Sequence, residues 1–145
     1  MRVYLDCCCF NRPFDNLSQV RVRLEAEAVE WVLEESVTGR FTLVTSDYVI
    51  TELLRNPDAV KRSQALAATQ YSQMHVPATA FILARATQIE ELGIGAFDAL
   101  HVAAAEAARC DYFLTTDDRL LKKSLRHHGK LMVTVLNPLD LTALP

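Results

Sequence analysis

The sequence has no apolar run long enough to cross a membrane. A spanning helix needs roughly 18 or more consecutive apolar residues, and no stretch of the 145 residues approaches that length. The chain also reaches Asp6 before a signal-like apolar segment could form. We therefore expect a cytoplasmic protein with no membrane partner.

Cysteines are few, and their spacing does not suit a disulfide framework. Three of the four are consecutive, Cys7 to Cys9, and only Cys110 lies elsewhere. Adjacent cysteines pair poorly, and three neighbours do not easily surround one tetrahedral zinc ion. We expect all four to be reduced and to act as small apolar side chains.

An excess of basic residues is also missing. The chain carries 15 Lys and Arg against 18 Asp and Glu, a formal charge of −3. This argues against a polybasic nucleic-acid binder, but an enzyme that meets phosphates through metal ions stays open. Half of the residues are apolar and 23% are charged, and there is no repeat or linker. These features fit one domain over residues 1–145, long enough to bury a core.

Short β-type runs alternate with helical segments along the chain. Strands are expected at 2–5, 41–45, 111–115 and 131–136, with a weaker extended piece at Val76. Helices are expected at 18–37, from Ser46 or Asp47 to 55, at 58–73, 79–92, 95–108 and 119–128, and residues 11–16 have turn chemistry. Such alternation predicts a parallel sheet with helices on both faces, and ligands bind beyond the carboxyl ends of such strands.

The alanine-rich segment from Gly95 to Ala108 places one carboxylate in an unusual position. Counted in steps of three and four, Asp98 shares a helical stripe with His101 and Val102. Asp98 should therefore face inward, where an ionised carboxylate needs a cation or several donors. The alternative is a surface residue that complements the helix dipole.

Four acids from separated segments point at one edge of the expected sheet. Asp6 and Asp117 stand at or just past strand ends, and Glu52 and Asp98 lie on helices. Like charges about 4 Å apart repel by roughly 4 kcal/mol at an effective dielectric of about 20. Such a cluster would take up protons or hold divalent cations, and oxygen ligands favour magnesium or manganese over zinc. These ions activate water toward phosphates, so the cluster indicates phosphodiester hydrolysis.

Four short segments, spread over nearly the whole chain, carry a resemblance to a known family. They are Val-Tyr-Leu-Asp at 3–6, Ser-Asp-Tyr-Val-Ile-Thr-Glu-Leu-Leu at 46–54, Phe-Asp-Ala-Leu-His-Val-Ala-Ala-Ala at 97–105 and Leu-Thr-Thr-Asp-Asp-Arg-Leu-Leu at 114–121. In this order they resemble the PIN-domain ribonucleases, of the kind that serves as the VapC-like toxin of type II toxin–antitoxin pairs. The resemblance implies a three-layer α/β/α sandwich with a mainly parallel sheet and an Mg²⁺- or Mn²⁺-dependent endoribonuclease. It also implies an RNA substrate, a cognate antitoxin and a homodimer.

The same resemblance assigns roles to individual residues. The implied catalytic residues and metal ligands are Asp6, Glu52, Asp98 and Asp117. Asp6 and Asp98 would be the firmest ligands, and the other two would complete the cage or orient water. Thr115 resembles the family's hydroxyl residue that supports the site.

Two positions depart from the family pattern. Cys7 stands where Thr or Ser usually follows the first acid, so a weak thiol donor replaces a hydroxyl. Asp117 and Asp118 are adjacent, which leaves the register of the fourth acid open. Asp117 is favoured because it follows Thr115 at the family's spacing.

Other polar residues have plainer interpretations. His101 is expected to be packed and hydrogen-bonded rather than a ligand, and His127 and His128 to be solvated. The basic residues Lys122, Lys123 and Arg126 could contact RNA phosphates or form a solvated face, and Arg12 is a further phosphate-contact candidate.

Two other enzyme classes and a phospho-receiver domain fit the sequence less well. A cysteine phosphatase needs Arg six positions after its nucleophile, but Pro13, Phe14 and Asp15 stand there. A haloacid-dehalogenase-like phosphatase needs an acid at position 8, which is Cys8, and a phospho-receiver domain needs paired acids before its first strand end. A catalytically silent PIN-like module that binds RNA or protein remains the alternative, although all four acids are present.

Overall fold

Five short strands form one parallel sheet in the computed structural model, which describes residues 1–145. The strands are β1 (Arg2–Leu5), β2 (Thr42–Ser46), β3 (Met74–Val76), β4 (Tyr112–Leu114) and β5 (Thr134–Leu136). Their order is β3-β2-β1-β4-β5, and every neighbouring pair is parallel. The first strand is therefore central, and all five carboxyl ends lie at one edge.

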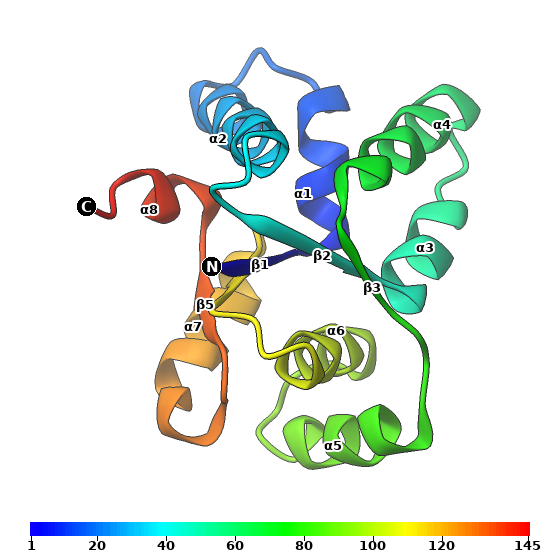
Figure 1. The fold of residues 1–145 in the computed structure, drawn as a ribbon, viewed down its shortest axis with the longest axis vertical. Coiled ribbons are helices and arrows are strands. Elements are labelled where there is room, and N and C mark those ends of the chain that lie inside the picture. Colours follow the sequence, from blue (N-terminus) through cyan, green and yellow to red (C-terminus); the bar gives the residue numbers. More distant parts are fainter.

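Helices cover both faces of this sheet, which confirms the expected three-layer α/β/α sandwich. The helices are α1 (Cys7–Asn11), α2 (Val20–Val37), α3 (Asp47–Leu54), α4 (Ala59–Ala68), α5 (Ala80–Glu90), α6 (Ala96–Ala107), α7 (Asp118–Arg126) and α8 (Pro138–Thr142). Figure 1 shows α1, α2 and α4 on one side of the sheet and α5 and α6 on the other. Short 3-10 helices lie at Arg12–Phe14, Thr69–Tyr71 and His128–Lys130.

The structure differs from the sequence-based expectation in a few local places. Residues 7–11 form a helix because the Asp6 carboxylate caps it, accepting a hydrogen bond from Cys7 N at 2.7 Å. The expected helix over 58–73 ends at Ala68 and continues only as a 3-10 turn. A last helix, α8, begins at Pro138 after the capping residue Asn137. Of the two expected cap candidates for α3, Ser46 caps the helix, in agreement with the sequence.

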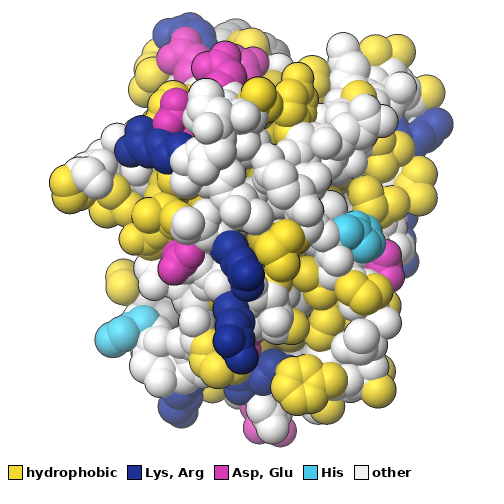
Figure 2. Space-filling view, viewed as in Figure 1, with side chains coloured by type: hydrophobic (Ala, Val, Ile, Leu, Met, Phe, Trp, Pro, Cys, Tyr) yellow, Lys and Arg dark blue, Asp and Glu magenta, His cyan; other side chains and the backbone are white.

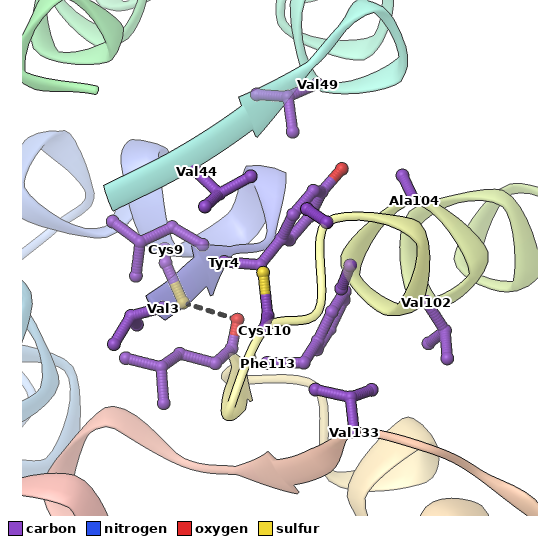
Figure 3. Close-up of a cluster of buried hydrophobic side chains, with 14 of the residues drawn as sticks. Val3, Tyr4, Cys9, Val44, Val49, Val102, Ala104, Cys110, Phe113 and Val133 are labelled. Carbon is purple, nitrogen blue, oxygen red and sulfur yellow. Dashed lines mark hydrogen bonds between the residues drawn. The ribbon is translucent and has the colours of Figure 1, made fainter. Parts of the chain in front are cut away.

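The hydrophobic core lies between the sheet and both helical layers. Side chains alternate along β1, so the rings of Tyr4 and, on neighbouring β4, Phe113 point toward α6, where Figure 3 shows Val102 and Ala104. The two rings are stacked with centroids 5.2 Å apart. Alanines on α6 keep that helix close to the sheet. Burying one such ring stabilises the fold by roughly 1.5–3 kcal/mol.

One buried carboxylate, that of Glu106, joins α6 to α5 and to the segment ahead of β5. The Glu106 side chain on α6 is 1% exposed and accepts hydrogen bonds from Arg85 Nε at 2.7 Å and Arg85 Nη2 at 3.2 Å. The backbone N–H of Met132, ahead of β5, donates to the same carboxylate at 2.9 Å. The charge of Glu106 is therefore neutralised inside the chain.

A second buried carboxylate, Glu25 on α2, is neutralised in the same way on the other face of the sheet. Its side chain is 1% exposed and lies 3.5 Å from the guanidinium groups of both Arg12 and Arg21. Asn137 Nδ2 donates to it at 2.5 Å, which joins α2 to the start of α8. Sequence reasoning singled out neither glutamate.

Two further expectations concerned the cysteines and helices that could span a membrane. All four cysteines are free, and Cys7, Cys9 and Cys110 are buried. None of the helices combines the length and apolar composition needed to cross a membrane.

Candidate active site

Asp6 lies where β1 ends and α1 begins. Its Oδ2 accepts hydrogen bonds from Thr115 Oγ1 at 2.8 Å and from Cys8 Sγ at 3.4 Å, while Oδ1 is held by the N–H of Cys7. Burial raises the pKa of the Asp6 carboxyl, and nearby His101 and the Thr115 hydroxyl partly oppose this shift. The carboxyl is thus fixed in orientation by β4 and by its own helix.

Glu52 reaches the same place from α3. Its Oε2 lies 2.6 Å from Nε2 of His101, and that nitrogen is 4.0 Å from Oδ1 of Asp6. Asp6, Glu52 and His101 each offer one ligand atom, all within 4.8 Å of one another, a spacing that one metal ion could share. His101 is fully buried and hydrogen-bonded, as expected, and it also belongs to this cluster.

A chain of neutral hydroxyl groups orients His101 from the other side of its ring. Nδ1 of His101 is 2.8 Å from Oη of Tyr4, which is 2.6 Å from Oγ of Ser46. Ser46 Oγ accepts from the N–H of Val49, so its own proton is available to Tyr4, and the proton of Tyr4 is available to Nδ1. This assignment uses each donor once and leaves the proton of neutral His101 on Nε2, directed at Glu52.

Asp98 carries the least satisfied carboxylate of the four. It lies on the first turn of α6, half-buried, and its side chain accepts no hydrogen bond and makes no ion pair. The pKa of Asp98 is raised to about 6, chiefly by burial and then by the negative charges of Asp6 and Asp117. The inward orientation expected from the helical stripe is therefore present, and Asp98 lies within electrostatic reach of the other three acids.

Asp117 faces the same pocket as Asp98. The pocket has a volume of about 210 Å³ and is lined by Ile94, Gly95, Asp98, Asp117, Arg119, Leu120 and Lys123. Asp117 caps α7 through Oδ1 alone, which accepts from the backbone N–H groups of Arg119 at 2.9 Å and Leu120 at 3.4 Å. Its Oδ2 makes no hydrogen bond and is free to bind a ligand.

Asp118 is oriented differently from its neighbour. It is 54% exposed and accepts two hydrogen bonds from the Arg21 guanidinium, at 2.8 and 2.6 Å. These bonds lower the pKa of the Asp118 carboxyl. Asp117, and not Asp118, is thus the member of the pair that lies beside Asp98.

The four acids share one electrostatic property: none of them forms an ion pair with Lys or Arg. The only charge-capable partner is His101, which lies near Asp6 and Glu52. Carboxylate oxygens gathered without internal cations form a donor set that fits a hard divalent ion such as magnesium or manganese.

The thiols of Cys7 and Cys8 lie next to Asp6, and the sequence singled out only Cys7. Burial, followed by the charges of Glu52 and Asp6, raises the pKa of the Cys7 thiol, and Asn11 Nδ2 donates to its sulfur at 3.8 Å. Cys8, which was not singled out as a site residue, contacts both Asp6 and Thr115 at 3.4 Å. Only its position two residues after the first acid could have indicated this contact.

The basic candidates divide into two groups. Lys123 lines the acidic pocket together with Arg119, whereas Lys122 and Arg126 do not. Arg12 is held by Asp15 at 3.1 Å and by Glu25 at 3.5 Å, so its charge is engaged within the fold. Figure 2 shows one short column of Lys and Arg side chains and several separate ones rather than a continuous basic surface, in keeping with the net charge of −3.

A larger hollow lies away from the acids. It measures about 610 Å³ and is lined mainly by apolar residues of α1, α2, α4 and the turns that follow α1 and α4, with none of the four acids among them. Pocket size therefore does not identify the candidate site, whereas the arrangement of charge does.

Comparisons with known proteins were made by sequence and by structure. The profile of the PIN domain family matches residues 4–124. The fold is similar to a chain in the crystal structure of VapBC2 from Rickettsia felis bound to a DNA fragment from their promoter. The sequence identity is 15%, the TM-score is 0.58, and the match covers 94% of this chain and 98% of that chain. A sequence search of curated proteins found no match.

Proposed function

The chain belongs to the PIN-domain family, and on this premise we propose that it is a divalent-metal-dependent endoribonuclease that hydrolyses RNA phosphodiester bonds. The catalytic residues in this proposal are Asp6, Glu52, Asp98 and Asp117. One observation carries it: the half-buried Asp98 carboxylate has no hydrogen bond and no ion pair, and its neighbours are further acids. When it is ionised, a carboxylate in such surroundings is stabilised by a ligand of opposite charge.

Magnesium or manganese would be held by these carboxylates. Asp6 and Asp98 would be the firmest ligands, with Glu52 and Asp117 completing the cage or orienting water. Such an ion, when bound, polarises a phosphodiester and supplies an activated water.

The chain's own residues prepare the site for this chemistry. Thr115 and the N–H of Cys7 fix the carboxylate of Asp6, and His101 fixes that of Glu52. Preorganised carboxylates need no rearrangement when the substrate arrives. Arg119 and Lys123 line the pocket of Asp98 and Asp117, where their cationic groups would contact substrate phosphates.

We further propose that this nuclease is a VapC-like toxin restrained by a cognate antitoxin. The structural likeness to a chain of a VapBC2 complex supports this through its fold. The antitoxin would insert a basic residue into the acidic pocket or cover it, and the nuclease would be a homodimer with one domain over residues 1–145. The four free cysteines support action in a reducing compartment such as the cytoplasm.

The second candidate function is a catalytically silent PIN-like module that binds RNA or protein. The 2.6 Å hydrogen bond between His101 and Glu52 favours it, because this bond already engages one of the four carboxylates without a metal. This module would bind RNA or a protein partner without turnover in either metal.

The decisive experiment is cleavage of labelled RNA by the purified protein in magnesium, in manganese and in chelator. Cleavage is expected with either metal, and its rate should fall at least about 100-fold in chelator and in Asp98→Asn. Glu90→Gln is the matched control, because Glu90 is an exposed acid at the end of α5 with no side-chain partner. Cleavage that persists in chelator and in Asp98→Asn would reject the mechanism, and RNA binding without turnover would select the silent module.

A further inference from the structure

We propose that Arg55 and Phe97 together form a contact for the RNA backbone at the rim of the acid site. Phe97 restrains the guanidinium of Arg55 through a cation–π contact, and Arg55 donates hydrogen bonds to a phosphate beside the one that is cleaved. This inference rests on the proposed function and specifies how the substrate is held.

The pair joins the two helices that carry Glu52 and Asp98. Arg55 is the residue that ends α3, and its backbone N–H donates to the carbonyl of Glu52 at 3.1 Å, so it lies one turn beyond that acid. Phe97 directly precedes Asp98 on α6. Cζ of Arg55 lies 5.1 Å from the centroid of the Phe97 ring.

The aromatic platform is itself fixed by the site. The Phe97 ring is half-buried, with its centroid 5.5 Å from that of the His101 ring at an interplanar angle of 49°. His101 is fully buried and bonded to Glu52. The position of Arg55 is therefore coupled, through Phe97, to the residue that orients one of the four acids.

The charge of Arg55 has no partner within the chain. The side chain is exposed, forms no ion pair and donates no hydrogen bond. A cation–π contact with Phe97 restrains the guanidinium and uses none of its N–H donors, and these can match two phosphate oxygens at once. A free, preoriented cation beside four carboxylates is suited to a polyanion that must approach a negatively charged site.

A second stacked arginine shows how this arrangement differs from a structural one. Cζ of Arg40 lies 5.3 Å from the Trp31 ring and 5.5 Å from the Phe41 ring, but its Nη1 is also paired with Glu35 at 3.1 Å. Arg40 precedes β2, at the amino edge of the sheet, away from the acids. It has the same stacking chemistry without the free charge and serves as a matched control.

The Arg55 contact defines a path for the RNA strand across the site. Arg119 and Lys123 lie in the pocket of Asp98 and Asp117, and Arg55 lies outside that pocket, next to Glu52. The RNA backbone would run from Arg55, near Glu52, across Asp98 toward Arg119 and Lys123 of α7.

The test measures binding of a short, labelled, single-stranded RNA of mixed sequence by fluorescence anisotropy over a range of salt, in magnesium and in the Asp98→Asn background. Arg55→Gln should weaken binding about fivefold and reduce the slope of log K against log salt by about 0.7, the value for one phosphate contact on a single strand. Arg55→Lys and Phe97→Leu should keep the slope and weaken binding about two- to threefold, because the charge remains and the oriented fork is lost. Arg40→Gln should change neither quantity.

Cleavage by the enzyme without the Asp98→Asn change gives a second reading. Arg55→Gln should raise KM about fivefold and leave kcat within about twofold, because the contact holds the substrate before and during reaction alike. Unchanged affinity and slope in Arg55→Gln, or an equal loss in Arg40→Gln, would overturn the inference while leaving the nuclease proposal intact. Arg55-dependent RNA binding without any cleavage in metal would instead reject the nuclease and retain this contact.

Discussion

Glu106 and Asp98 lie on the same helix, α6, and the fold treats their carboxylates in opposite ways. Glu106 is fully buried, yet Arg85 and the N–H of Met132 satisfy both of its oxygens. Asp98 is only half-buried, but it has neither a donor nor a cation, and burial together with the neighbouring acids raises its pKa to about 6. Glu106 is neutralised inside the chain, whereas Asp98 in the candidate site has no partner there.

The largest effect should come from breaking the internally neutralised pair. Arg85→Leu leaves Glu106 buried without its cation and should destabilise the protein by about 3–4 kcal/mol, a fall in Tm of about 10 °C. Urea and thermal unfolding followed by circular dichroism would measure it. The double variant Arg85→Leu, Glu106→Leu should recover most of the loss, and a loss below about 1 kcal/mol in the single variant would contradict the assigned role.

Divalent ions should stabilise the folded protein by binding the carboxylates of the candidate site. Magnesium or manganese at about 100 times its dissociation constant should raise the stability of the wild-type protein by about 2.7 kcal/mol. Asp98→Asn should lose most of this gain, and Glu90→Gln should keep it. Thermal unfolding with and without metal measures the difference, and an equal gain in wild-type protein and Asp98→Asn would show that the ion binds elsewhere.

Breaking the chain of hydrogen bonds from Ser46 through Tyr4 to His101 should lower stability by a smaller amount. It should also lower turnover. Tyr4→Phe leaves Nδ1 of His101 without its donor and the Ser46 hydroxyl proton without its acceptor, and it should cost about 1–2 kcal/mol. The proton on the ring would no longer be fixed at Nε2, so turnover should fall about tenfold.

Nitrogen chemical shifts of the His101 ring, recorded by NMR, would report the tautomer directly. Tyr71→Phe is the control, because Tyr71 is exposed and its hydroxyl makes no hydrogen bond. An unchanged tautomer in Tyr4→Phe would remove this role from Tyr4.

The smallest effect concerns the pH dependence of stability without metal. The Asp98 pKa is about 6 in the folded protein against 3.8 for an unperturbed carboxyl. The folded state binds more protons between these values, so the wild-type protein loses stability as pH rises from about 4 to about 6.

Asn cannot ionise, so Asp98→Asn should be more stable than wild type by about 1 kcal/mol at about pH 8, after allowance for screening by solvent. This advantage should vanish near pH 4. Urea unfolding in chelator at both pH values measures it, and a destabilised Asp98→Asn at about pH 8 would mean that the carboxylate serves the fold.

The edge at which the acids gather was predictable because parallel strands end together. Asp6 and Thr115 directly follow β1 and β4, which are neighbours in the sheet. The inward direction of Asp98 followed from helical spacing alone. The resemblance already favoured Asp117 over Asp118, and the structure adds that Asp118 is bound by Arg21, which is distant in sequence.

Other features left no local pattern. The helix at residues 7–11 was missed because three cysteines and a phenylalanine show no helical periodicity, and only the capping Asp6 indicated it. The partners of Glu25 and Glu106 come from distant segments, so nothing in the sequence selected these two from the 18 acids. The stacking of Arg55 on Phe97 also joins two helices far apart in the chain.

The central place of the first strand has a consequence for synthesis on the ribosome. Asp6 emerges early, but β1 lies between β2 and β4, and Thr115, which fixes Asp6, follows β4. Asp117 comes later still. A nascent chain therefore holds no complete site until residue 117 has left the exit tunnel and the last central strand has docked, because parallel pairing requires contacts between distant segments. In the proposed nuclease, the candidate site is consequently incomplete for most of translation.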